Sequence, residues 1–192
     1  MKTELLGIKG NWREVADSAN TTVNRKPGSR EPAASWKRRM LLCEHSPIRQ
    51  LFMKLKWHEL KSWISVHFVR HKIGIEHWVR SQRTDRTGIN RDGLPQSNFV
   101  EHEIMANAQA MINISRKRLC NQASKETREA WQAALDVFKD REPELFAACV
   151  PDCVYRGWCY EFKSCGYHLT KAFQDRLTSY RQDINNTSPS PQ

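Results

Sequence analysis

Apolar residues recur along the chain with two different periods, so the sequence predicts both strands and helices. In the segment Leu51–Trp57, residues 51, 53, 55 and 57 are apolar and two of the three positions between them are lysines. This alternation is the pattern of a half-buried strand. From Leu60 to Phe68 the apolar spacing changes to three and four, which predicts a helix that carries Arg70 and His71 at its C-terminal end. We expect Gly74 to end that segment.

Further helices are expected on both sides of this region. Ser97 can cap a long helix that runs through Asn121, because Ile104, Ala108, Met111, Ser115 and Leu119 would share one face. A helical turn should open at Glu142 and Pro143, and the Cys-rich segment after it reads as irregular. Shorter helices are predicted over Trp12–Asn20, Ala34–Glu44 and Ser124–Lys139.

The length of 192 residues suits one domain with a core of its own. We expect that domain to cover residues 1–181. Residues 182–192 are polar and end in SPSPQ, so they are predicted to form a disordered tail.

The chain is basic, with 31 Lys and Arg against 21 Asp and Glu, a formal net charge of +10. Such a surface attracts anions, including nucleotides, folate polyglutamates and nucleic acid. No stretch approaches the roughly 20 apolar residues of a membrane helix, and the N-terminus lacks the apolar region of a signal peptide. We therefore expect a cytoplasmic protein that is not bound to a membrane, with reduced cysteines or metal ligands and no disulfide framework.

Four cysteines cluster late in the chain: Cys149, Cys153, Cys159 and Cys165. Four thiolates can close a tetrahedral zinc site. Their spacings of four, six and six lack the paired CxxC knuckles of common zinc motifs, so free or buried thiols are the interpretation that we favour. Cys120 is expected to act as a small core hydrophobe.

A dense basic string, HFVRHKIGIEHWVRSQR, occupies residues 67–83. It holds four Arg or Lys and three His among apolar residues, and Arg70 and His71 directly follow a helix that reads as buried. Arg forks of this kind hold phosphate groups through two parallel donors. The string therefore predicts an anion-binding cleft.

The same string resembles the signature of the flavin-dependent thymidylate synthases, which opens with Arg-His-Arg and closes with Ser, one residue and Arg. Arg70, His71 and Lys72 match the opening triplet. Ser81 and Arg83 match the close if one residue is inserted. The family's inner Asn-Glu pair is replaced within residues 76–79.

A second segment, NAQAMINISRKR at residues 107–118, resembles a helix of the same family without gaps. Asn107 and Asn113 match its flavin-contacting asparagines, Gln109 replaces an Arg, and Arg118 falls on the Arg that activates the pyrimidine. Arg91 fits a further nucleotide-binding Arg. Ser46, in EHSPI, replaces a flavin-contacting Thr.

The resemblance implies an α+β fold in which a twisted antiparallel sheet is packed with helices and which assembles as a homotetramer. It implies methylation of dUMP to dTMP with FAD as cofactor, methylenetetrahydrofolate as one-carbon donor and NADPH as reductant. Arg118 would be the catalytic residue. Substrate contacts are expected from His67, Arg70, Ser81, Gln82, Arg83, Arg91 and Arg118, and cofactor contacts from Ser46, Arg70, His71, Lys72, Asn107, Gln109 and Asn113.

Two departures from the family pattern keep alternatives open. His67 stands where the family has Gln, and a helical insertion between the signature and Arg91 is missing. One alternative is a flavin-dependent one-carbon transferase that acts on another pyrimidine nucleotide. The other is a non-catalytic, basic protein that binds nucleotides or nucleic acid.

Overall fold

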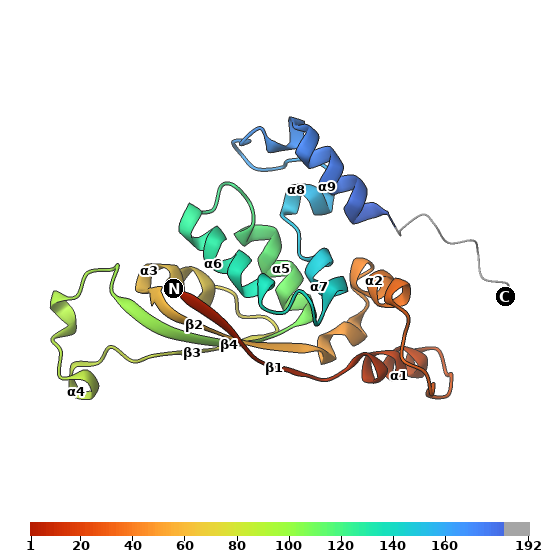
Figure 1. Ribbon diagram of the computed structural model, residues 1–192, viewed down its shortest axis with the longest axis horizontal. Coiled ribbons are helices and arrows are strands. Elements are labelled where there is room, and N and C mark those ends of the chain that lie inside the picture. The colour runs from red at the N-terminus through yellow and green to blue at the C-terminus, as the bar shows by residue number, and fades with distance from the viewer. Residues whose placement is uncertain (183–192) are drawn as a thin grey trace.

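A four-stranded antiparallel sheet lies at the centre of the protein (Figure 1). The computed structural model describes residues 1–182. The predicted disordered tail, residues 182–192, therefore lies outside the described residues except for Gln182. The strands are β1 (Lys2–Lys9), β2 (Phe52–Lys61), β3 (Ile75–Val79) and β4 (Phe99–Asn107), in the order β1-β2-β4-β3. The predicted α+β fold with an antiparallel sheet is confirmed.

The two central strands carry the buried face of the sheet. Leu55 pairs with Ile104, and Trp57 pairs with His102. All four of these side chains are fully buried. The register then shifts in a bulge after Trp57, where Glu59 adopts a left-handed φ of 55°.

Helices cover one face of the sheet (Figure 1). Those nearest to it are α3 (Ser62–Val69), α5 (Ala108–Arg118) and α6 (Lys125–Asp136). Trp57 stacks on Phe68 of α3 with ring centroids 4.8 Å apart, and its indole N–H donates to the carbonyl of Ala130 in α6 at 2.9 Å. Near one end of the sheet lie α1 (Trp12–Thr22), α2 (Ala34–Leu42), the 3-10 turn η1 (Ser46–Gln50) and α7 (Pro143–Ala148).

The residues that connect β3 to β4, 80–98, form what we call the arm, which projects beyond the sheet (Figure 1). It contains the short helix α4 (Thr84–Thr87) and the 3-10 turn η2 (Arg91–Gly93). We call residues 1–149 without the arm the sheet body.

The residues after the sheet body, 150–182, form the C-terminal unit. It holds α8 (Asp152–Arg156), the 3-10 turn η3 (Tyr167–Leu169) and α9 (Lys171–Arg181). Its own apolar cluster consists of Val150, Val154, Phe173, Leu177 and Tyr180.

Helices α1, α2, α3, α6 and α7 agree with the predicted helices, whereas α4, α8, α9 and three of the four strands were not predicted. The single helix expected from Ser97 to Asn121 is wrong, because residues 99–107 form β4 and the helix starts only at Ala108. Strands β1 and β3 were not expected. The strand predicted at Leu51–Trp57 is confirmed and runs on to Lys61, which delays the next helix to Ser62. The Cys-rich segment was expected to be irregular, but it contains α8. Within residues 1–182, no helix has the length and apolar character that crossing a membrane requires.

Candidate functional site

The junction between β4 and α5 sets the position of the first group of candidate residues. Asn107 ends the strand and caps the helix, since its side-chain oxygen accepts the N–H of Ala110 at 2.9 Å. Its backbone N–H donates to the carbonyl of Gly74 at 2.8 Å, and the next N–H, of Ala108, donates to Leu51. Three segments distant in the sequence are therefore fixed around one residue.

An open hollow of about 480 Å³ lies beside this junction. Gly74 approaches Asn107 so closely that a Cβ at position 74 would lie 2.7 Å from the amide nitrogen, and its φ is +72°. Only glycine fits there without strain. Three of the predicted cofactor residues line the hollow, which is bounded by Glu44, Arg49, Ile73, Gly74, Asn107, Gln109 and Asn113.

A polar network holds one wall of the hollow in place. Glu44, which adopts a left-handed φ of 51°, accepts hydrogen bonds from Gln109 and from Arg116. Arg116 also donates to the side-chain oxygen of Asn113 at 3.1 Å, and its guanidinium lies 3.5 Å from the centre of the Tyr155 ring. The sequence analysis gave no role to Glu44 or Arg116. The three-residue spacing of Asn113 and Arg116 on one helix face could have indicated their pairing.

At the other end of α5, Arg118 is held by two hydrogen bonds. Its Nε donates to Nε2 of His71 at 2.9 Å, and its Nη2 donates to the carbonyl of His67 at 2.7 Å. His71 must therefore be neutral, with its proton on Nδ1. Burial, followed by the charges of Arg118 and His77, lowers the pKa of His71 to about 4, which agrees with this geometry.

Positive charge gathers around Arg118. Burial first, and then the charge of Arg70, lowers the pKa of the Arg118 guanidinium. Burial also lowers the pKa of His67, followed by the charges of Arg118 and Arg70, and its Nδ1 lies 2.9 Å from the Thr127 hydroxyl. Arg70 is exposed at the end of α3. An anion bound here would relieve the repulsion between Arg70 and Arg118.

Two histidines without a predicted role, His77 and His102, form a hydrogen-bonded chain that ends at the backbone of His71. His77 Nε2 donates to the carbonyl of His71 at 2.9 Å, so its Nδ1 accepts from Nε2 of His102 at 3.0 Å when both rings are neutral. His102 is fully buried, and within residues 1–182 its Nδ1 has no hydrogen-bond partner. Burial, followed by the charge of His77, lowers the pKa of His102 to about 4. The position of His102 midway between Val100 and Ile104, two apolar residues of the same strand face, is the signal that could have placed it inside.

The remaining predicted residues lie apart from this group. Ser81, Gln82, Arg83 and Arg91 lie on the arm, which begins where the Arg80 N–H donates to the carbonyl of Glu101, and six residue steps of β4, about 20 Å, separate Glu101 from Asn107. Within the arm, Arg83 pairs with Asp85 at 2.7 Å. Ser46 and Lys72 are exposed on segments that border the hollow, but neither lines it. One chain thus brings together His67, Arg70, His71 and Arg118 at one end of α5, and Asn107, Gln109 and Asn113 along the hollow.

Comparison with known proteins gives a fold and no family. No family model matches the chain, and no curated protein matches it. Two similar solved structures are of the flavin-dependent thymidylate synthase ThyX from Helicobacter pylori, each with FAD and dUMP. They align with a TM-score of 0.65 at 14% and 15% identity, over 78% of this chain and 100% and 99% of theirs. The protein therefore has the fold of the flavin-dependent thymidylate synthase ThyX.

Proposed function

We propose that the protein is an FAD-dependent enzyme that methylates dUMP to dTMP, with methylenetetrahydrofolate as one-carbon donor and NADPH as reductant. The arrangement of α5 carries this proposal. Over a length of about 16 Å, the helix presents Asn107, Gln109 and Asn113 to the hollow, and at its end it holds Arg118 beside the charge of Arg70. An extended dinucleotide and a pyrimidine nucleotide can be bound next to each other along such a helix.

The residues of the hollow suit a flavin. The volume of about 480 Å³ lies within the usual range of cofactor pockets. Asn107, Gln109 and Asn113 carry amide groups that can both donate to and accept from a heterocycle edge. The close packing of Gly74 on Asn107 lets a planar ring approach the backbone. The structurally similar ThyX structures hold FAD.

Further cofactor contacts are proposed for residues at the rim of the hollow. Ser46 and Lys72 border it, while Arg70 and His71 precede its lining residue Ile73 and lead toward Arg118, so the exposed Arg70 and Lys72 can meet the diphosphate. Bound FAD would supply the redox chemistry that turns a transferred methylene into a methyl group.

Arg118 is proposed to activate the pyrimidine. Its two hydrogen bonds to His71 and His67 use two of its five N–H groups, so the others can donate to O2 and the ionised N3 of uracil. The neutral His71 fixes the orientation of the guanidinium without adding a charge. A fixed positive charge stabilises the negative charge that the ring must carry before carbon 5 can act as a nucleophile. His67 would contact the base beside it.

The arm is proposed to complete the site of another copy in a homotetramer. Among the described residues, the side-chain hydrogen bonds and ion pairs of Ser81, Arg83 and Arg91 stay within the arm, and none of them involves Arg118, His67 or His71. Arg83 and Arg91 are about 60% exposed, and the arm projects from the sheet (Figure 1). In a symmetric assembly the arm of one subunit can supply phosphate-binding groups to its neighbour.

Flavin titration of the purified protein tests the cofactor. We expect a yellow protein, or one that binds added FAD, and Asn113→Ala should weaken binding about tenfold, the loss of roughly one hydrogen bond. Asn113 is the better choice because Asn107 also caps α5. Lys117→Ala, an exposed change on the same helix, should leave the affinity unchanged. A colourless protein with no titration signal would exclude a flavoenzyme.

Product analysis tests the reaction. With dUMP, methylenetetrahydrofolate and NADPH, dTMP should form, and dCMP should give no methylated product. Methylation of dCMP in place of dUMP would indicate another pyrimidine substrate.

Light scattering tests the assembly. The molar mass of the particle should be about four chain masses, whereas a monomer that turns over dUMP would contradict the shared site.

A further inference from the structure

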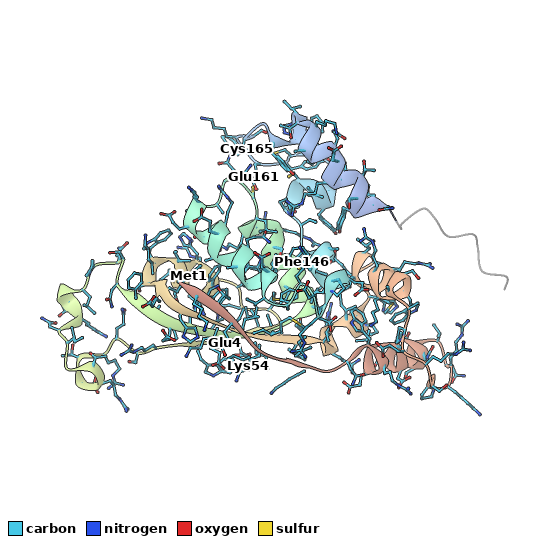
Figure 2. All side chains as sticks on the ribbon, in the orientation of Figure 1. Met1, Glu4, Lys54, Phe146, Glu161 and Cys165 are labelled. Atoms are coloured by element: carbon cyan, nitrogen blue, oxygen red, sulfur yellow. The ribbon has the colours of Figure 1, made fainter. Side chains whose placement is uncertain are left out.

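Four of the six cysteines line one cavity at the junction of the C-terminal unit and α5. The cavity has a volume of about 180 Å³. Its cysteines come from the turn after α5 (Cys120), from α8 (Cys153) and from the loop 157–166 (Cys159 and Cys165). Residues as far apart in sequence as 120 and 165 therefore meet there. Figure 2 shows Cys165 and Glu161 on this loop, at the outer edge of the molecule.

This set differs from the one that the sequence suggested. Cys149 is buried beside Ser115 and Arg116, where burial raises the pKa of its thiol to about 12, and it does not line the cavity. Cys120 takes its place in the cluster. Cys43 is exposed at the end of α2, far from the cavity in sequence, and is not among its lining residues.

Contacts around the thiols hold the loop 157–166 against the end of α5. Gln122 Nε2 donates to the carbonyl of Lys163 at 2.6 Å, and Asn121 Nδ2 lies 3.7 Å from the sulfur of Cys165. Cys120 Sγ lies 3.9 Å from a carboxylate oxygen of Glu161 on the same loop. Thiols that gather at one cavity in this way can be joined by a metal cation.

Apolar packing gives this region little other support. The apolar cluster of the C-terminal unit has five buried residues, all on α8, α9 and the segment before α8. The loop itself contributes none, and it exposes Trp158, Tyr160 and Phe162 to solvent. Small units with so little core commonly depend on a structural metal.

We propose that Cys120, Cys153, Cys159 and Cys165 bind one structural Zn²⁺ that fastens the C-terminal unit to α5. Four thiolates from separate segments form the tetrahedral set that zinc prefers, with Zn–S distances of about 2.3 Å. Within residues 1–182, no three His, Cys, Asp or Glu side chains already form a metal-binding group. Binding must therefore pull the loop 157–166 inward and contract the cavity, and the four thiols release their protons.

Two other polar side chains at the cavity, Asp152 and His168, have partners of their own, so we do not propose them as zinc ligands. Asp152 pairs with Arg156 at 3.5 Å. His168 Nδ1 lies 3.1 Å from the Ser164 hydroxyl, and its ring packs edge-on against Trp158. Arg176 lines the cavity and can offset the double negative charge of a zinc bound by four thiolates.

Metal analysis of the full chain, purified under reducing conditions, tests the proposal. We expect one zinc per chain, and substitution with Co²⁺ should give the intense visible and near-ultraviolet bands of tetrahedral cobalt thiolate. Cys120→Ser and Cys159→Ser should each lose most of the metal. Cys43→Ser, which changes an exposed thiol outside the cavity, should retain one zinc per chain.

Hydrogen exchange gives a second readout that does not depend on the variants folding well. Removal of the metal by a chelator should speed exchange in residues 150–182 and leave β2 and β4 protected. No zinc uptake and no cobalt spectrum after reconstitution would overturn the proposal, and so would disulfides among the four cysteines or iron–sulfur absorption. None of these measurements involves FAD or dUMP, so their outcome is independent of the proposed function.

Discussion

The sheet body and the C-terminal unit contrast in how they are held together. In the sheet body, strands and helices share one continuous core in which Trp57, Phe68 and Trp131 meet. In the C-terminal unit, an apolar cluster of five buried residues supports two helices and a loop that exposes three aromatic rings. The proposed catalytic groups therefore lie in the region with the larger apolar core.

The largest difference should follow from truncating one core residue in each region. Ile104→Ala, in the fully buried centre of β4, should lower the free energy of unfolding of the whole protein by about 2–5 kcal/mol. Phe173→Ala, in the small cluster, should open the C-terminal unit alone. Denaturant titration and hydrogen exchange resolved by peptide measure the two effects. Equal loss of protection in β4 and α9 for Phe173→Ala would show that the two regions unfold as one.

The same contrast explains which elements could be predicted from sequence. Strand β2 was visible because it alternates buried apolar residues with lysines. Edge strands β1 and β3 were missed because they bury little: in β3 only Ile75 is buried. A central strand can be recognised from the alternation of apolar and polar residues in its own sequence. An edge strand buries few side chains and is recognised mainly by its pairing with a neighbouring strand.

The error at β4 has a more specific cause. Ile104 and Ala108 are both buried, one in the strand and one in the helix, so their spacing of four resembled a continuous helical face. His102, a buried polar residue, masked the period-two pattern of the strand. That Asn113 and Arg118 share one helix could be predicted from local sequence, and their roles stay predictions. The support of Arg118 by His71 and the place of Cys120 depend on contacts between distant segments.

Removal of the Arg118 charge should affect chemistry while leaving the fold of both regions intact. Arg118→Ala should reduce dTMP formation about 100-fold or more, the scale for loss of one preorganised electrostatic group. Arg118→Lys should recover little, because an ammonium lacks the planar fork. FAD binding should survive, since the hollow lies at the other end of α5.

Lys117→Ala is the matched control for this prediction. Lys117 is exposed on α5 next to Arg118, so its loss should change the rate by no more than a few-fold. If Arg118→Ala formed dTMP at the parent rate, the roles proposed for Asn107 and Asn113 would be lost as well, because they rest on the same alignment.

Acid should weaken the sheet body through its buried histidine. The pKa of His102 is about 4 in the folded protein, below its ordinary value of 6.5, so the unfolded chain binds the proton more readily. The free energy of unfolding should therefore fall as the pH drops from about 6.5 to 4 and level off below that, by roughly 3 kcal/mol from this residue. His102→Phe should flatten this part of the profile, and His45→Gln, at an exposed position, should not. Urea unfolding between pH 7 and 4 provides the measurement, and parallel profiles for parent and His102→Phe would contradict it.

The smallest effect is expected from the exposed ion pair on α9. Lys171 Nζ lies 2.7 Å from Asp175, but the two side chains are 86% and 63% exposed, so water and salt screen the attraction. Lys171 is also the first residue of the helix, where a positive charge opposes the helix dipole. Lys171→Ala should thus change the free energy of unfolding by less than about 0.5 kcal/mol, and added salt should abolish the difference.

A buried polar contact of the sheet body supplies the contrast. The indole of Trp12 donates to Glu142 at 2.8 Å, and Glu142→Ala should lower the free energy of unfolding by about 1–3 kcal/mol because that N–H is left unpaired. Denaturant titration of both variants at low and high salt compares them. A salt-insensitive loss at Lys171 as large as that at Glu142 would show that polar contacts of the C-terminal unit contribute as much as those inside the sheet body.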